Sequence, residues 1–326
     1  MRRGLFWLCG LTVLIVTVWC AGYYFVITQA NQALDNLARR DAAPVRADCS
    51  DRVISGFPLQ IALHCSSISV DPTDPHRPKF SVARLIGITD LTSPGSIQFT
   101  AEPPFIAKPA FGPAIHLTWD SARADGSVWL QGPERFDASL RTAQLDLVDG
   151  DNRRMAGKVE NIKLQAWRVA AIPGAFEVSV DAGRLHTPAL PSMIADMTGL
   201  VQVRPDPDAP TQFAGPGVAY DIARFRLAAG RFVAHLSGAL QLDNNGRANG
   251  KLVLKVIALN HLPELLTPVV RADDPRLAAL LAAVTALGVP AQLNGSPARK
   301  INLQVRSGRV FAGLIPLGRI PALRAQ

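Results

Sequence analysis

Residues 232–259 read FVAHLSGALQLDNNGRANGKLVLKVIAL and carry the clearest indication of the fold class. Apolar residues alternate with polar or small ones from Phe232 to Leu242, and again from Leu252 to Val256. This two-residue period is typical of a strand with one buried face, because successive side chains point to opposite faces of a sheet. Asn244-Asn245-Gly246 stands between the two segments and favours a tight turn. The stretch therefore predicts an antiparallel hairpin with one apolar face.

The same alternation recurs along most of the chain. Turn-forming pairs punctuate it at Asp125-Gly126, Asp149-Gly150 and Ser307-Gly308, while prolines cluster in 101–113 and 204–218 and predict irregular connections there. We therefore predict a mainly β protein whose body is an elongated, curved antiparallel β-sheet. The alternating apolar residues include Leu59, Ile61 and Leu63; Ile115, Leu117 and Trp119; Ile162, Leu164 and Ala166; and Phe176, Val178 and Val180.

One interruption is helical. Between about residues 261 and 288 the apolar residues take helical spacing, Asp273-Asp274-Pro275 suits a helix start, and Gly288 followed by Pro290 suits a helix end. Strand alternation then returns from Ile301 and resumes after Ser307-Gly308. We expect a helical insertion at about 261–288, followed by a terminal hairpin.

The N-terminus predicts a membrane anchor. Residues 5–27 contain no charge and are long enough to cross a bilayer, whereas Arg2 and Arg3 precede them and favour a cytoplasmic start. A cleaved signal peptide is the alternative, but its apolar region is usually shorter. We expect a cytoplasmic tip at 1–4, an uncleaved transmembrane signal-anchor at 5–27, a juxtamembrane helix at 28–43 and a periplasmic β-rich domain at 44–326, hence a single-pass bacterial inner-membrane protein.

Two cysteines follow the anchor in CSDRVISGFPLQIALHC, residues 49–65. A hairpin with its loop at Gly56-Phe57-Pro58 would place Cys49 directly opposite Cys65, and an oxidising compartment would join them. We predict a disulfide between Cys49 and Cys65. Two buried free thiols are the alternative.

Known catalytic signatures are absent from the sequence. It contains no G-x-S-x-G, P-loop, H-E-x-x-H or dinucleotide-binding motif, and its six histidines are far apart. The 27 arginines and 7 lysines are scattered, and export makes nucleic acid an unexpected partner. We assign no catalytic, cofactor-binding or metal-binding residue and expect a protein that is not an enzyme.

The apolar face itself is the best candidate for a binding surface. A sheet curled around an apolar groove would accommodate acyl chains, although the same alternation also builds a sealed core. We name one possible inward face of the groove, which consists of Leu236, Leu240, Leu252, Leu254 and Val256.

The entry segment at 49–65, the stretch at 232–259, the helical segment and the ending INLQVRSGRVFAGLIPLGRIP at 301–321 together resemble domain-of-unknown-function family 2125 of proteobacterial envelope proteins. The C-terminal arrangement is also similar to the wider AsmA-like group. The resemblance implies an inner-membrane anchor, a periplasmic β-rich body and a role with envelope lipids. We expect binding or transfer of phospholipid, glycolipid or another apolar envelope molecule. The alternative is a non-enzymatic assembly or interaction factor that docks an envelope protein.

Overall fold

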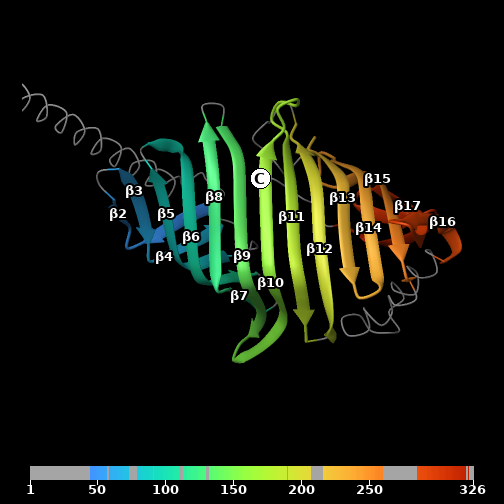
Figure 1. Ribbon diagram of the computed structural model, residues 1–326, viewed down its shortest axis with the longest axis horizontal. Helices are drawn as coiled ribbons and strands as arrows, with labels where there is room; N and C mark the ends of the chain where they lie inside the picture. Colours follow the sequence, from blue (N-terminus) through green and yellow to red (C-terminus); the bar gives the residue numbers. More distant parts are fainter. Residues whose placement is uncertain are drawn as a thin grey trace, which may run out of the picture.

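The computed structural model describes residues 45–56, 59–72, 79–90, 92–109, 113–129, 132–188, 190–206, 216–259, 285–320 and 322. Within these ranges, nineteen strands form one antiparallel sheet (Figure 1). The prediction of a mainly β, antiparallel body is confirmed.

The strands follow one another across the sheet almost in chain order (Figure 1). The first are β1 (Val45–Ser50), β2 (Val53–Ser55), β3 (Gln60–Cys65), β4 (Ser67–Pro72), β5 (Lys79–Asp90), β6 (Ser93–Lys108), β7 (Ala114–Thr118) and β8 (Ser121–Trp129). The central ones are β9 (Gly132–Asp149), β10 (Asn152–Arg168), β11 (Phe176–Thr187), β12 (Leu190–Arg204), β13 (Ala219–Ala229), β14 (Phe232–Leu242) and β15 (Ala248–Ile257). The last are β16 (Val289–Leu293), β17 (Ser296–Arg306), β18 (Arg309–Ala312) and β19 (Ile315–Arg319).

Short strands share a partner at three places. β3 and β4 both pair with β5, while β7 and β8 both lie between β6 and β9. From β9 to β15 each strand pairs with the next, and β15 then pairs with β17, which also pairs with β16 and β18.

Strand register separates an apolar face from a polar one. One row of directly paired residues crosses eleven strands and is apolar throughout: Cys65, Leu85, Ala101, Ala122, Leu140, Ile162, Ala182, Met197, Leu227, Ala234 and Val256. The adjacent row faces the other way and is almost entirely polar: His64, Ile86, Thr100, Arg123, Ser139, Lys163, Asp181, Thr198, Arg226, His235 and Lys255.

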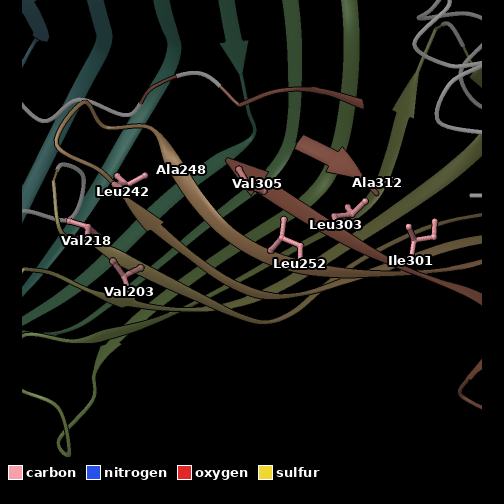
Figure 2. Packing of buried hydrophobic residues seen from close by; sticks show 9 residues of the cluster. All are labelled: Val203, Val218, Leu242, Ala248, Leu252, Ile301, Leu303, Val305 and Ala312. Carbon is pink, nitrogen blue, oxygen red and sulfur yellow. The ribbon is translucent and has the colours of Figure 1, made fainter. Parts of the chain in front are cut away.

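Full burial on the apolar face is concentrated near the C-terminal end of the sheet. A cluster of nine buried side chains comes from β12, β14, β15, β17, β18 and the turn before β13. Figure 2 shows its members from close by: Val203, Val218, Leu242, Ala248, Leu252, Ile301, Leu303, Val305 and Ala312. A smaller cluster joins Ala229, Phe232 and Val256. These clusters hold the sheet together at this end.

A row of irregular positions crosses the middle strands. Thr142 on β9 and Arg184 on β11 have positive φ angles of 52° and 57°, and Glu160 on β10 lies between them. Glu160 Oε2 lies 3.0 Å from Arg184 Nη1, and the Arg184 backbone N–H donates to Asp196 Oδ1 on β12 at 2.9 Å. Leu140 and Ala143 on β9 therefore lie on the same face of the sheet, although residues three positions apart in a regular strand would face opposite ways.

The disulfide between Cys49 and Cys65 is confirmed, with their Cα atoms 5.3 Å apart. The predicted register around it is wrong. Ile54 pairs with Leu63 and Ser55 with Ala62, so the loop of this hairpin is longer than three residues. Cys49 pairs with Ile68 on β4 instead of facing Cys65, because the chain bends at Asp51, whose φ is 47°, and β1 leaves the β2–β3 hairpin. The disulfide thus links the β1–β4 pair to the β2–β3 pair.

Two other local predictions also need correction. Asp125 and Gly126 are not a turn but lie within β8, where they pair with β6 and β9. The proline-rich segment at 101–113 is not wholly irregular, because β6 continues through a cis Pro103-Pro104 bond to Lys108. The predicted turns at Asp149-Gly150, Asn244-Asn245-Gly246 and Ser307-Gly308 are confirmed.

The predicted tip at 1–4, anchor at 5–27 and juxtamembrane helix at 28–43 lie outside the described residues, as does most of the predicted helical insertion at 261–288. Residues 285–287 are helical. Among the described residues no helix has the length and apolar character needed to span a membrane.

Removal of the disulfide should destabilise the protein. The bond closes a loop with a sequence separation of 16 residues. Replacing both cysteines, in Cys49→Ser/Cys65→Ser, should lower the free energy of unfolding by about 3 kcal/mol, because the unfolded chain regains the entropy of the open loop. Denaturant unfolding of the full chain in neutral detergent measures the difference. A change below about 1 kcal/mol would contradict this role of the bond.

Candidate functional site

A trough lies on the apolar face over β5, β6, β8, β9 and β10. Its volume is about 330 Å³ and its lining is almost wholly apolar. The floor consists of small side chains on three neighbouring strands: Ala101 on β6, Ala122 and Ala124 on β8, and Ala138 on β9. We call this feature the alanine trough.

Strand pairing explains why the trough has walls. Ala101 pairs with Ala122, and Ala124 pairs with Ala138, so alanines meet alanines at the centre. Large side chains flank them on both sides: Leu85 and Phe99 on β5 and β6, and Leu140, Ile162 and Leu164 on β9 and β10. A sheet position occupied by alanine leaves the space that a leucine or phenylalanine would fill.

Glycine also shapes the wall at Phe99. Gly87 on β5 pairs with Phe99, and a Cβ atom at Gly87 would stand only 3.2 Å from Phe99 Cε1. The absence of a side chain at Gly87 therefore lets the Phe99 ring lie across β5. This packing holds one wall of the alanine trough.

The trough is open. Leu85, Phe99, Leu140, Ile162 and Leu164 are all only partly buried. Within the described ranges between residues 79 and 188, the buried apolar residues are Ala107, Trp119, Ala143, Ala175 and Ala182, of which only Trp119 is large. Large apolar side chains in this half of the sheet thus remain in contact with solvent, unlike those in the C-terminal cluster.

The five residues that sequence reasoning proposed for a groove do share one face. Leu236 pairs with Leu254, Leu240 with Gly250, Leu252 with Gly238, and Val256 with Ala234. Leu252 and Val256 are only 5% and 4% exposed and belong to the two buried clusters, while Leu236, Leu240 and Leu254 pack against the larger one. The structure therefore places these residues in the packed end of the apolar face, away from the alanine trough.

The floor of the trough was not identified from the sequence. Ala122 and Ala124 alternate with charged residues in SARADG, at 121–126, which is a weak strand pattern beside the predicted turn at Asp125-Gly126. Ala101 stands in the proline-rich segment that predicted an irregular connection. Only the cross-strand register shows that these alanines meet.

The opposite face carries ion pairs and hydrogen bonds. Arg135 Nε donates to Asp137 Oδ2 at 2.5 Å, and Gln165 Nε2 donates to Asp137 Oδ1 at 2.7 Å. The hydrogen bond from Arg135 is the main reason that the pKa of Asp137 lies below its ordinary value. Further along, burial lowers the pKa of His235, and the positive charges of Lys255, Arg224 and Arg226 lower it further. This face is polar and is positively charged around His235.

Asp146 is a buried carboxylate on β9, where it alternates with the apolar residues Leu145 and Leu147 and is only 1% exposed. Arg153 Nε donates to its Oδ2 at 2.8 Å, and Gln144 Nε2 donates to its Oδ1 at 3.1 Å. Burial alone would raise the pKa of Asp146, but the hydrogen bonds from Arg153 and Gln144 outweigh it and hold the pKa below its ordinary value. This contact joins the β9 and β10 strands beyond the trough.

Metal-ligating side chains do not gather in the described part of the chain, which contains no group of three or more His, Cys, Asp or Glu residues able to hold a metal ion. What the described residues bring together is an open apolar trough on one face and a charged surface on the other.

Replacing Asp146 should change how stability depends on pH. At pH 7, Asp146→Asn should lower the free energy of unfolding by about 1–3 kcal/mol, because charged hydrogen bonds are lost. A lowered folded pKa means that the contribution is complete above the unfolded value of about 4 and is lost as pH falls through the folded pKa. Denaturant unfolding between about pH 6 and pH 2 should show the two proteins converging.

The exposed Asp125 on β8 supplies a matched control for this experiment. Asp125→Asn removes the same charge and should alter the free energy of unfolding by less than about 0.5 kcal/mol. An Asp146→Asn deficit that stays constant down to the lowest pH would contradict the role assigned to the carboxylate.

Comparison with known proteins places the chain in a family. No curated protein matches the sequence. The family described as "Uncharacterized protein conserved in bacteria (DUF2125)" matches residues 24–321, which is nearly the whole chain. The protein therefore belongs to the DUF2125 family.

Proposed function

We propose that this protein binds lipid, or another apolar molecule of the bacterial envelope, in the alanine trough, and that it helps to transfer that molecule. The open, apolar trough is the observation that carries the proposal. A volume of about 330 Å³ lies at the lower end of the range of small-molecule sites, which suits a single extended acyl chain.

The composition of the trough determines how it would bind. Its lining is almost wholly apolar, so binding would depend on removing methylene groups from water, which stabilises a complex by about 0.8 kcal/mol for each fully buried group. Arg123 and Ser139, which belong to the polar row, also contribute to its lining. Such a site would recognise the tail of a lipid and leave its head group outside the trough.

The cellular setting is part of the proposal. Residues 5–27 would anchor the protein in the inner membrane once, and the sheet would stand in the periplasm beside the source of lipid. The disulfide between Cys49 and Cys65 supports an oxidising compartment. The resemblance to the AsmA-like group, whose members are implicated in moving envelope lipids, supports the same role. We infer a binding protein without enzymatic activity.

A variant that fills the trough should prevent lipid binding. Ala124→Phe places a ring on the floor, where the open face allows it to fit without displacing the backbone, so lipid should be excluded while the fold is kept. The full chain is purified in neutral detergent, and native mass spectrometry followed by organic extraction measures the lipid bound to each protein. The wild type should carry stoichiometric phospholipid or glycolipid, and the variant should carry little.

Thr100→Phe is the matched control. Thr100 is exposed on β6, in the polar row, so the same ring is added to the other face of the sheet. This control should bind lipid as the wild type does, and it accounts for lipid that merely surrounds the anchor. Equal lipid in both variants would contradict binding in the trough. A wild-type protein without lipid would instead favour the alternative, an assembly factor that docks an envelope protein.

A further inference from the structure

Four arginines line a second cavity at the C-terminal end of the sheet. The cavity has a volume of about 540 Å³, and its lining includes Arg247, Arg306, Arg309 and Arg319 together with the apolar side chains of Phe311 and Ile320. Arg247 follows the β14–β15 turn, whereas the other three stand on β17, β18 and β19.

Three of these arginines are directly opposite one another. Arg306 pairs with Arg309 across the β17–β18 hairpin, and Arg309 pairs with Arg319 across β18 and β19. Like charges at directly opposed positions of a sheet destabilise it. A row of three opposed arginines therefore lowers the stability of the folded protein unless an anion lies between them.

Backbone contacts fix this arrangement. Ser307 and Gly308 form the hairpin turn, with φ angles of 47° and 76°. The Ser307 N–H donates to Asn249 Oδ1 at 2.8 Å, and the Gly308 N–H donates to the Ala248 carbonyl oxygen at 2.8 Å. The Ile320 N–H in turn donates to the Gly308 carbonyl oxygen at 2.7 Å. The strands that carry the arginines are thus held together before any ligand binds.

Of the four arginines, only Arg247 interacts with a described acid, Asp243, and its positive charge is one of the smaller causes that lower the pKa of that carboxyl. None of the ion pairs that the structure shows among its described residues includes these four arginines. Arg306 Nη2 donates to the neutral amide oxygen of Gln304 at 2.7 Å. The neighbouring Asp243 accepts the backbone N–H groups of Asn245 and Arg247, at 2.8 Å and 2.9 Å, so its carboxylate is engaged within its own turn.

The arginine side chain at the centre of the row points away from the apolar face, although Ile320 in the cavity lining packs against the large buried cluster. Arg309 alternates with Val310, and Val310 packs against the large buried cluster. The Arg309 side chain therefore lies on the opposite side of the sheet from that core. A ligand here would not share a surface with a lipid tail in the alanine trough.

We propose that this cavity binds a phosphoryl group, carried either by a lipid head group or by a soluble phosphate. The planar guanidinium group offers paired N–H donors that match two oxygens of a phosphate, and several arginines together can surround the anion. Phe311 and Ile320 supply an apolar wall, which restricts competing water around these hydrogen bonds. The site extends beyond the proposed function and does not depend on it.

Calorimetry with two probes tests the site. The full chain, in neutral detergent, is titrated with inorganic phosphate and with dihexanoyl phosphatidylglycerol below its micellar concentration. We expect the wild type to bind at least one of them. Arg309→Gln/Arg319→Gln should weaken binding by about tenfold or more, because charge-assisted hydrogen bonds to the anion are lost. Higher salt should weaken binding to the wild type.

A charge-matched control separates this site from general attraction. Arg154 is exposed on β10 and Arg231 is exposed in the β13–β14 turn, so Arg154→Gln/Arg231→Gln makes the same change in net charge and should bind like the wild type. Preference for the phosphatidylglycerol identifies a head-group site, whereas equal or tighter binding of inorganic phosphate identifies a soluble phosphate. Absence of binding by both probes, or equal weakening in both double variants, would overturn the proposal.

Thermal unfolding distinguishes loss of the site from loss of the fold. Without ligand, Arg309→Gln/Arg319→Gln should unfold at the same temperature as the wild type or at a higher one, because repulsion between opposed charges is removed. Phosphate should raise the unfolding temperature of the wild type alone. If the double variant is unstable, the single variant Arg319→Gln on β19 replaces it. A rise in its unfolding temperature with phosphate as large as that of the wild type would overturn the proposal. Ala124→Phe, which fills the alanine trough, should bind phosphate as the wild type does. This outcome separates a failure of the arginine site from a failure of the trough.

Discussion

Strict alternation of side chains across a β-strand is the constraint on which this protein depends. A slip of one residue at any pairing would turn an apolar row toward the polar face and place charged side chains against the buried cluster. The row from Cys65 to Val256 avoids this over eleven successive strands, although the chain between them contains many turns. Both the packed C-terminal clusters and the alanine trough exist because that register is kept.

Irregular backbone positions keep the apolar side chains on one face at places where the sequence itself does not alternate strictly. Residues Thr142 and Arg184 take left-handed backbone angles in neighbouring parts of β9 and β11, and the apolar pattern resumes on the same face beyond them. A positive φ is unfavourable for these residue types. The Arg184–Glu160 ion pair and the hydrogen bond from the Arg184 backbone N–H to Asp196 lie at this position. A register shift between Met155 and Gly157 interrupts the β9–β10 ladder, and Figure 1 shows this hairpin curving away at its lower end.

Local sequence pattern was sufficient to predict the class of fold and several turns, because strand alternation and Gly-containing turns depend on residues that are close together in the sequence. The local pattern also predicted the disulfide, but with a wrong strand pairing. The chain bends at Asp51, so β1 pairs with β4, and no pattern among neighbouring residues predicts this pairing. Asp125-Gly126 failed as a turn because cross-strand partners on β6 and β9 hold it extended. The alanine trough depends on which strands become neighbours, so it could not be predicted from the alternation alone.

The shape of the alanine trough depends on different residues from those that stabilise the sheet. Ala122, Ala124 and Ala138 each contribute little buried area, so the stability of the sheet depends far more on the leucines and valines elsewhere on the apolar face. Replacing one of these methyl groups by hydrogen or by an isopropyl group would deepen or narrow the channel while leaving the hydrogen-bonded ladder in place. Under the proposed function, single substitutions at this floor would change the width of the apolar molecule that fits, without a new scaffold.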